Sequence, residues 1–249
     1  MQRVFHPLPA AGSKEITITG ENAKYLNSVL RVKRGERFVL FDSEGEHFEV
    51  EVASVSKGRV DVDVCASLGV RNEPESGVIL AVGLLKGAKM ELVIQKAVEL
   101  GVSAIVPLET RRTVVRETRK LERWRKIALE AARQCGRPTP PSVEEPRGLA
   151  EYLESAGPSL KGVVFYEGDG LKPLAPGDLE AGPGKGSIVA VGPEGGFAPD
   201  EVELMTSKGL RARTLGGNIL RAETAAIVAV TLAQYLSGRL GRPALDGDA

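Results

Sequence analysis

The chain has 249 residues, 42% of them hydrophobic and 27% charged, a composition typical of a soluble globular protein with a sizeable core. Its apolar runs are far shorter than the roughly 20 residues of a membrane helix, and the N-terminal stretch lacks the apolar core of a signal peptide. Two isolated cysteines and two histidines argue against a disulfide framework and a histidine-based metal site or triad. We therefore expect a cytoplasmic protein without a metal.

The first 68 residues predict a small β-rich module. Apolar and charged residues alternate over 59–64, which is the period-two pattern of a half-buried strand. The segment 23–36 is helical in its first half and basic after it, and Gly45 marks a hairpin. Four segments are predicted as strands: 16–19, 37–42, 47–55 and 59–64. We expect a compact barrel, followed by a linker over 69–77 that breaks both periodicities.

Strands and helices alternate after the linker, which predicts a mostly parallel sheet covered by helices on both faces. Apolar positions recur at helical spacing in each predicted helix, and Pro199 occupies the expected first turn of one of them. The predicted strands are 78–85, 103–108, 161–166, 187–191 and 212–216, and the predicted helices are 89–100, 118–135, 199–209 and 223–236. Residues 167–186, rich in Gly and Pro, are predicted as a long loop. The fold class is therefore α/β.

The net charge of zero hides a strongly basic segment at 111–137, which holds ten basic and three acidic residues. Such a segment attracts phosphates at moderate salt, because each contact releases condensed counterions. The alternative is a solvated helix face without a partner. Composition alone leaves both open.

The stretch "VGPEGGFAPD" follows the predicted strand 187–191 and precedes a helix. In open α/β sheets ligands bind beyond the carboxyl ends of strands, and glycines let a ligand approach the backbone closely. A nucleotide-triphosphate loop would need a lysine after the last glycine, and none follows Gly196. The dinucleotide fingerprint fails as well, because Gly168 and Gly170 are followed by no third glycine. The other interpretation is a plain strand-to-helix turn.

A second glycine-containing loop, "TLGGNILRAETAAI" at 214–227, also follows a short strand and enters a helix. Two such loops at one sheet edge could surround a compact ligand with backbone N–H and C=O groups. An adenine or an amino-acid moiety suits this arrangement better than a chain of phosphates. Arg221 and Glu223 flank the helix start, where a local ion pair is the alternative interpretation.

Four motifs occur in this order and at these distances in one protein family. They are "QKAVELGVSAIVPLETRRTVV", "RWRKIALEAARQCGRPTPP", "VGPEGGFAPDE" and "LGGNILRAETAAIVA", together with the earlier "LRVKRGERFVLFDSEG". The chain resembles the ribosomal RNA small subunit methyltransferase E family of the SPOUT superfamily over nearly its full length. Four motifs in register are far more specific than one glycine loop.

This resemblance implies a PUA-like β-barrel RNA-binding domain over 1–70 and a SPOUT methyltransferase domain over 71–249. The second domain would carry a C-terminal trefoil knot, a feature that general chain-threading rules would have rejected. The family acts as homodimers with S-adenosyl-L-methionine as cofactor. The implied reaction is methylation of N3 of a single uridine in 16S rRNA, within the small ribosomal subunit.

The resemblance and the chemistry of the implied reaction assign roles to residues of this chain. Arg111, Arg112 and Arg221 are the candidates for stabilising the anion that forms on the uracil, and Glu223 or Glu194 would accept a proton or orient an arginine. The expected cofactor-binding residues are Val191, Gly192, Pro193, Glu194, Gly195, Gly196, Leu215, Gly216, Asn218, Ile219, Leu220, Thr224 and Ala225. The expected RNA-binding residues are Lys33, Arg34, Arg111, Arg112, Arg123, Lys126 and Arg133.

Asn218 departs from the family pattern, which often has a basic residue at this position. Two alternatives to uridine N3 methylation stay open from the sequence. One is the same fold with another methyl acceptor, such as a ribose 2′-hydroxyl. The other is a non-catalytic RNA-binding factor, although Gly192, Gly195, Gly196 and Gly216 are all present.

Overall fold

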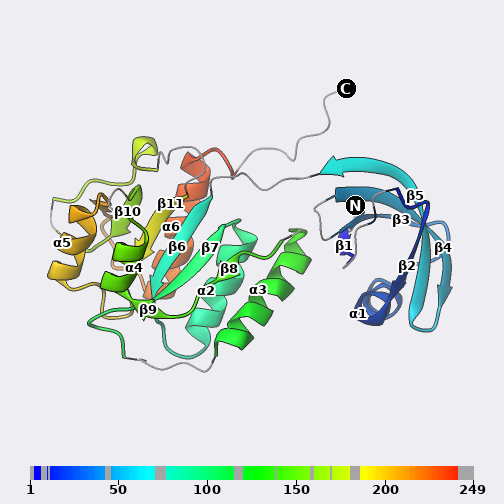
Figure 1. Cartoon of the computed structure of the whole chain (residues 1–249), viewed down its shortest axis with the longest axis horizontal. Coiled ribbons are helices and arrows are strands. Elements are labelled where there is room, and N and C mark those ends of the chain that lie inside the picture. The colour runs from blue at the N-terminus through cyan, green and yellow to red at the C-terminus, as the bar shows by residue number, and fades with distance from the viewer. Residues whose placement is uncertain are drawn as a thin grey trace. The chain divides into compact units, whose positions relative to one another are not determined.

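The computed structural model divides the chain into two compact units (Figure 1). The first comprises Met1–Glu73 with Ala132–Pro140, and the second comprises Pro74–Ala131 with Pro141–Ala249. The residues that the structure describes are 3–6, 10, 12–42, 46–70, 77–114, 120–137, 139–157, 160–168, 170–179 and 186–240. Each unit has its own hydrophobic core.

The first unit is a five-stranded sheet that curls into a half-barrel, in the order β1-β3-β4-β5-β2. Four of its five strands pair antiparallel, whereas β1 pairs parallel with β3. The strands are β1 (Arg3–Phe5), β2 (Glu15–Thr19), β3 (Arg37–Phe41), β4 (Glu46–Ser56) and β5 (Arg59–Val70). Ile16 and Ile18 of β2 are buried between exposed neighbours, and they face Val62 and Val60 of β5. The predicted alternation is therefore confirmed.

A short helical segment covers this curled sheet. It consists of α1 (Gly20–Lys24) and one π-helical stretch, η1 (Tyr25–Leu30), and its Ala23 and Leu26 are fully buried in the core. The helix predicted for the first half of 23–36 is therefore found, although it begins earlier. The sequence predicted a compact barrel; among the described residues β1 and β2 are edge strands, so the sheet is an open half-barrel. The predicted hairpin turn at Gly45 and most of the linker lie outside the described residues.

The second unit is an entirely parallel sheet in the order β12-β10-β11-β6-β7-β8, with β9 also paired to β7. Its strands are β6 (Val78–Gly83), β7 (Ala104–Glu109), β8 (Ser142–Val143), β9 (Arg147–Gly148), β10 (Gly162–Phe165), β11 (Ser187–Val191) and β12 (Arg211–Arg213). All residues of β10 and β11 are buried, as expected of central strands covered on both faces. The predicted parallel α/β arrangement is confirmed.

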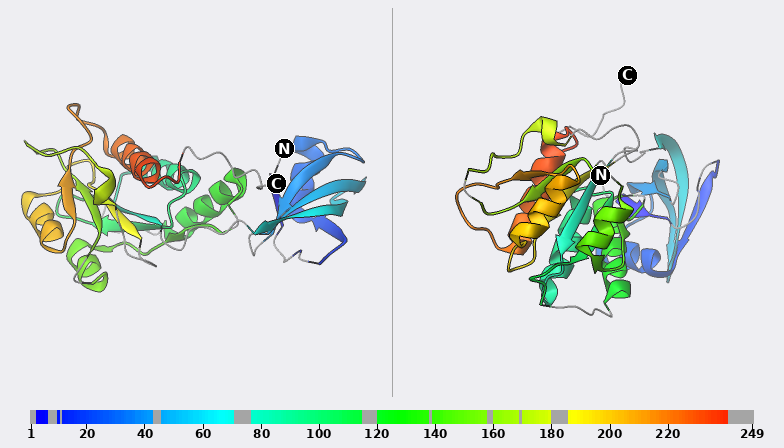
Figure 2. Two further views of the ribbon diagram at one scale, coloured as in Figure 1. Left: turned by 90° about the horizontal axis from the view of Figure 1, so that it is seen from above. Right: turned by 60° about the vertical axis from the view of Figure 1, so that its left-hand side comes forward.

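Helices lie on both faces of this sheet (Figure 2). They are α2 (Ala88–Glu99), α3 (Leu121–Cys135), α4 (Leu149–Ser155), α5 (Pro199–Ser207) and α6 (Ala222–Leu236). Helices α2 and α6 pack on each other and α6 contacts β6 and β11, whereas α4 and α5 lie on the opposite face. The sequence did not predict α4, although its buried Leu149, Tyr152 and Leu153 have helical spacing. Pro199 occupies the first turn of α5, as predicted.

No described helix combines the length and apolar character that crossing a membrane requires. Within the described ranges, no three His, Cys, Asp or Glu side chains gather in a way that could hold a metal ion. Both histidines, His6 and His47, are buried in the first unit.

A buried carboxylate fixes part of the long loop between β10 and β11 to the edge strand β12. Arg213 donates two hydrogen bonds to Asp178, at 2.5 and 2.7 Å, and Arg211 donates a third at 3.0 Å. Thr214 then pairs with Pro173 in an isolated parallel bridge. Hydrogen bonds from Arg213 hold the pKa of Asp178 far below its ordinary value, against the opposing effect of burial, and the Ala175 amide and Arg211 add to the shift. The end of β12 is thereby held in place.

We predict that Asp178→Asn lowers the free energy of unfolding by about 3 kcal/mol at pH 7, because the partly buried Arg213 loses its charged partner. A carboxylate with a depressed folded-state pKa stabilises fully above its unfolded-state pKa of about 3.9, and this stabilisation is lost as the pH falls further. Urea unfolding at pH 7 and at pH 3 measures the difference between variant and wild type, which should shrink at pH 3.

The matched control is Asp200→Asn, which removes an exposed ion pair with Arg111. Exposed pairs contribute little, so this variant should lose less than about 1 kcal/mol. An Asp178→Asn effect that equals the control, or that persists undiminished at pH 3, would contradict stabilisation by the charged Asp178 carboxylate.

Candidate functional site

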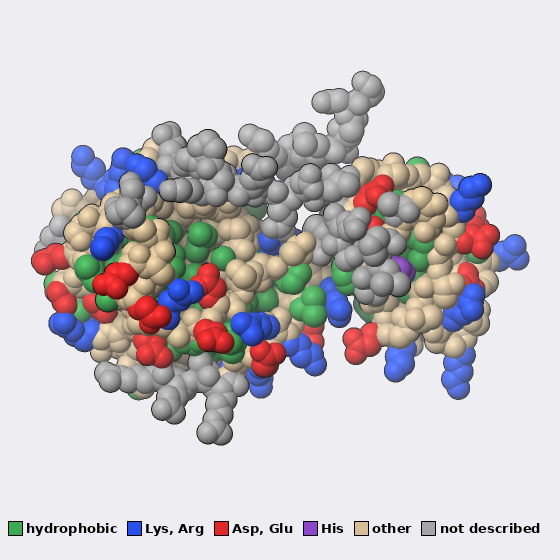
Figure 3. Space-filling model, in the orientation of Figure 1, with side chains coloured by type: hydrophobic (Ala, Val, Ile, Leu, Met, Phe, Trp, Pro, Cys, Tyr) green, Lys and Arg blue, Asp and Glu red, His purple; other side chains and the backbone are tan. Residues whose placement is uncertain are grey.

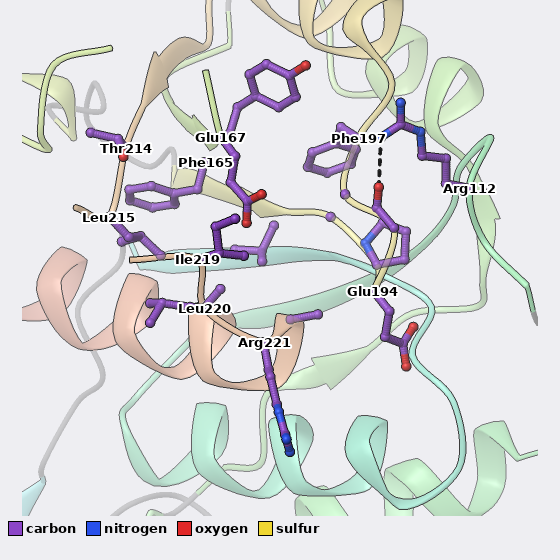
Figure 4. A pocket seen from close by; sticks show the side chains of 18 of the residues that line it. Arg112, Phe165, Glu167, Glu194, Phe197, Thr214, Leu215, Ile219, Leu220 and Arg221 are labelled. Atoms are coloured by element: carbon purple, nitrogen blue, oxygen red, sulfur yellow. Dashed lines mark hydrogen bonds between the residues drawn. The ribbon is translucent and has the colours of Figure 1, made fainter. Parts of the chain in front are cut away.

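A pocket of about 520 Å³ lies at the carboxyl ends of β10, β11 and β12 (Figure 4). Its walls come from the loop after β11, the loop between β12 and α6, and the residues that follow β10. The lining includes twelve of the thirteen expected cofactor-binding residues, namely Val191, Gly192, Pro193, Glu194, Gly195, Gly196, Leu215, Gly216, Asn218, Ile219, Leu220 and Ala225. Thr224 is not part of the lining. The structure thus brings the two predicted glycine-containing loops to one cavity.

The first loop folds back on itself so tightly that position 192 has no room for a side chain. A Cβ on Gly192 would lie 2.8 Å from the carbonyl carbon of Gly196 and from the amide nitrogen of Phe197. The turn is closed by a hydrogen bond of 2.8 Å from the Gly196 amide to the Pro193 carbonyl. Arg112 donates a further bond of 2.8 Å to the Gly195 carbonyl, which Figure 4 marks. The loop is therefore fixed by its own backbone and by one arginine.

Glu194 connects this loop to the start of α2. Its Oε1 atom accepts hydrogen bonds from the Lys86 amide at 3.1 Å and from the Lys89 ammonium at 3.3 Å. Lys89 also lies 3.6 Å from Glu223 at the start of α6, so one ammonium bridges carboxylates from both loops. Burial raises the pKa of Glu194, but the hydrogen bonds from the Lys86 amide, its own amide and Lys89 outweigh this effect and lower the pKa. Glu194 is therefore a weak base, better suited to holding the loop than to accepting a proton.

The second loop needs glycine for its backbone conformation. Gly216 has a φ of 125°, which side-chain-bearing residues rarely adopt. The Thr214 hydroxyl lies 3.2 Å from both the amide nitrogen and the carbonyl oxygen of Gly216. Beyond it Ile219 is 82% exposed, although it lines the pocket. The loop thus presents an apolar side chain and backbone groups to the cavity.

The apolar part of the wall includes two phenylalanines that were not among the residues predicted from the sequence. Phe165, at the end of β10, groups with Leu215, Ile219 and Leu220 on one side of the pocket, and Phe197 lies on the other (Figure 4). Tyr166 and Glu167, next in the chain after Phe165, also line the pocket. The rule that ligands bind beyond strand carboxyl ends applies to 161–166 as well and could have identified them.

The arginines expected to assist catalysis differ in their surroundings. Arg111 forms an ion pair of 2.5 Å with Asp200, and Arg112 is bonded to Gly195 as described. Arg221 is exposed at the pocket, and it has no ion pair with any described residue. Figure 4 shows Arg221 and Glu194 extending to the same side, away from Phe165. Of the three arginines, Arg221 is the one most available to a substrate.

The residues expected to bind RNA also separate into two groups. Arg123 pairs with Glu91 at 2.7 Å, Lys126 lies 3.9 Å from Glu130, and the Arg133 guanidinium lies 5.4 Å from the Phe5 ring centroid. Lys33 and Arg34 of the first unit are exposed, and neither has an ion pair among the described residues. Part of the basic segment is thus engaged within the protein.

The pocket fits a ligand of the size and mixed polarity of S-adenosylmethionine. Its volume lies within the ~300–1,000 Å³ that small-molecule sites span. The apolar side chains can cover a purine, and the loop backbones offer the donors and acceptors that a purine edge needs. Lys89, Arg221 and Glu167 supply charges of both signs for an amino-acid group and ribose hydroxyls.

Comparison with known proteins gives the same answer as the pocket. Residues 72–234 match the RNA methyltransferase domain family, and residues 18–65 match the RNA methyltransferase PUA domain family. The ribosomal RNA small subunit methyltransferase E of Bacillus subtilis (strain 168) is 33% identical, over 94% of this chain and 96% of that protein. The chain belongs to the ribosomal RNA small subunit methyltransferase E family.

Two solved structures are similar to this family member over almost all of its length. The methyltransferase E of Neisseria gonorrhoeae, bound to S-adenosyl methionine, is 31% identical with a TM-score of 0.78, over 95% of this chain and 98% of that one. The putative methyltransferase Lpg2936 of Legionella pneumophila, in complex with the cofactor SAM, is 31% identical with a TM-score of 0.75, over 94% and 96%.

We predict that Gly192→Ala weakens S-adenosylmethionine binding by this family member at least about tenfold, because a new methyl group would displace the loop backbone. Titration calorimetry measures the dissociation constant. The matched control is Gly217→Ala, where an added Cβ meets nothing within 4 Å. The control should keep its affinity within about twofold, and equal effects in the two variants would contradict the close approach at Gly192.

Proposed function

We propose that the chain transfers a methyl group from S-adenosyl-L-methionine to N3 of one uridine in 16S rRNA, within the small ribosomal subunit. The observation that carries this proposal is the pocket between the two glycine-containing loops in a member of this methyltransferase family. The twelve lining residues named above would hold the cofactor, and Phe165, Glu167 and Phe197 join them. Thr224 is left out because it does not line the pocket.

The cofactor, when bound, supplies an electrophilic methyl group on a sulfonium. The protein must then position the uracil and help it lose the N3 proton as the nitrogen attacks. Arg221 is our candidate for stabilising the negative charge that forms on the uracil, because it is exposed at the pocket and has no ion pair with a described residue. Arg112 would act indirectly, because its hydrogen bond to the Gly195 carbonyl holds the loop after β11 in place.

Glu223 is our candidate for the proton acceptor or for orienting Arg221. Its side chain is 13% exposed, and its Oε2 atom accepts no hydrogen bond from a described residue, although Lys89 lies 3.6 Å away. Glu194 is less suited, because its pKa is lowered by the bonds that hold the loop. Glu223 does not itself line the pocket, but it follows Ala222, which does, so its carboxylate would act from the edge of the cavity. Glu194 lines the pocket, but its Oε1 atom already accepts two hydrogen bonds.

We also propose the family's domain and knot architecture for this chain. Residues 1–70 would be a PUA-like RNA-binding domain, and residues 71–249 a SPOUT methyltransferase domain with a C-terminal trefoil knot. The predicted homodimer is supported by exposed apolar side chains on α2 and α6. These two helices pack on each other within the chain. Leu92 is 41% exposed, Leu232 is 37% exposed and Tyr235 is 63% exposed. A cytoplasmic location follows from the ribosomal substrate.

Product analysis tests the proposal. Labelled S-adenosylmethionine is incubated with the protein and small ribosomal subunits that lack the modification, and the rRNA is digested to nucleosides for mass spectrometry. We expect 3-methyluridine from the wild type. A 2′-O-methyl nucleoside would keep the enzyme class and change the acceptor, whereas cofactor binding without any methylated nucleoside would overturn the proposed reaction.

In the same assay we predict that Arg221→Ala loses more than about 99% of the transfer rate, equal to about 2.7 kcal/mol of transition-state stabilisation. The substitution is at an exposed residue, so the thermal midpoint should stay within a few degrees of the wild type. The matched control is Lys161→Ala, at an exposed position just before β10 that does not line the pocket. Near-normal turnover by Arg221→Ala would remove this residue from the site.

A further inference from the structure

The first unit carries a cluster of exposed cations. It differs from the basic segment of α3 because its cations have no acidic partners among the described residues. Between residues 22 and 35 the chain has four basic residues and no acidic residue. Lys24, Arg31, Lys33 and Arg34 are all exposed. None of the four has an ion pair with a described residue, so their charge faces solvent.

The cations of α3 differ because most have acidic neighbours. Arg123 pairs with Glu91, Arg125 pairs with Glu122, and Lys126 lies near Glu130. An ion pair offers little net charge to a distant phosphate, even where its side chains are exposed. A polyanion should therefore bind the unpaired cluster more strongly than α3, in spite of the longer run of basic residues there.

An exposed aromatic side chain lies beside this cluster. Tyr25 is 45% exposed and Val29, one turn further along η1, is 66% exposed, whereas Leu26 between them is fully buried. We call the exposed face of Lys24, Tyr25, Ser28 and Val29, with the following Arg31, Lys33 and Arg34, the η1 surface. In Figure 3, Lys and Arg side chains project from the end of the unit where Figure 1 labels α1.

The backbone of the η1 surface is unusual at the same place. Residues 25–30 form a π-helical stretch, a conformation that is rare and often marks functional sites. Arg31 ends it in the left-handed region, with a φ of 52°, and it is the only non-glycine among the described residues with a positive φ. The Val32 amide then bonds to the Leu26 carbonyl at 3.1 Å. This turn holds Arg31 immediately after the exposed end of the helix.

We propose that the η1 surface binds a single-stranded segment of RNA. Arg31, Lys33 and Arg34 would contact phosphates, and one unstacked base would lie on the ring of Tyr25. A single-stranded segment is required because bases inside a double helix cannot stack on a side chain. The inference rests on the proposed function for its choice of RNA. It assigns the main RNA-binding surface to η1 and the residues that follow it, instead of to α3.

Binding of a fluorescein-labelled, unstructured twelve-nucleotide RNA, measured by anisotropy at several KCl concentrations, tests the charged part. The variant Arg31→Gly, Lys33→Gln, Arg34→Gln removes three cations, and glycine readily adopts the φ of position 31. Each phosphate contact to a single strand contributes about 0.7 to the slope of log affinity against log salt, so the slope should fall by about 2. The matched control, Arg123→Gln with Lys126→Gln, should leave the slope almost unchanged.

Substitutions of Tyr25 test the base contact. Tyr25→Ala should weaken RNA binding between about five- and a hundred-fold at every salt concentration, without changing the slope, whereas Tyr25→Phe keeps the ring and should bind like the wild type. Equal binding by Tyr25→Ala and Tyr25→Phe would remove the stacking contact. Circular dichroism and S-adenosylmethionine titration of each variant check that the fold and the pocket are intact.

A triple variant with the wild-type slope, or a control variant with the larger loss of slope, would overturn the η1 surface. Failure to bind RNA in the wild type, together with binding of an acidic protein of the small subunit, would replace RNA by a protein partner and would also overturn it. If the wild type binds RNA through this surface but transfers no methyl group, the proposed function is contradicted and the η1 surface is not.

Discussion

The carboxylate of Glu194 holds the loop after β11 against the start of α2, and the pocket depends on this attachment. The Lys86 amide and the Lys89 ammonium both donate to it, and Lys89 extends the contact to Glu223 at the start of α6. Arg112 holds the other side of the same loop through the Gly195 carbonyl. A glycine-containing loop is easily deformed by itself, so these contacts turn it into a fixed wall of a binding site.

The second wall is fixed by a different device. The Asp178 carboxylate receives hydrogen bonds from Arg211 and Arg213 of β12, which lies at the edge of the sheet. The loop that begins at Thr214 therefore starts from a strand held on its outer side by the segment around Asp178. An edge strand of three residues would otherwise have one neighbour only, β10. The pocket thus forms between two loops that are each anchored by a buried or partly buried carboxylate.

The two glycine-containing loops were predictable because their signals are local. A strand, a cluster of glycines and a helix start follow one another within a few residues, and parallel strands place all such loops at one edge. Lys89 was not predicted, because its partner Glu194 is 105 residues away and no pattern connects them. Phe165 and Glu167 were missed although the same edge rule applies to them. The open half-barrel and the start of the helix near residue 20 depend on pairing and packing that local patterns do not specify.

The basic segment shows the opposite limit of sequence reasoning. Residues 111–137 carry an excess of positive charge, but two of their arginines pair with acids from outside this segment. Arg111 pairs with Asp200, and Arg123 pairs with Glu91. The shorter stretch at 22–35 has fewer cations and no acids, and its charges remain unpaired among the described residues. Pairing, which only a structure reveals, decides which cluster can attract phosphates.

Hydrogen–deuterium exchange with and without S-adenosylmethionine tests the central claim that both loops form one cofactor site. We expect slower exchange of backbone amides in 192–197 and 214–222 when the cofactor is added, because both loops line the pocket, and no change in 24–34 of the first unit. Protection confined to one loop, or located mainly outside the second unit, would contradict the account.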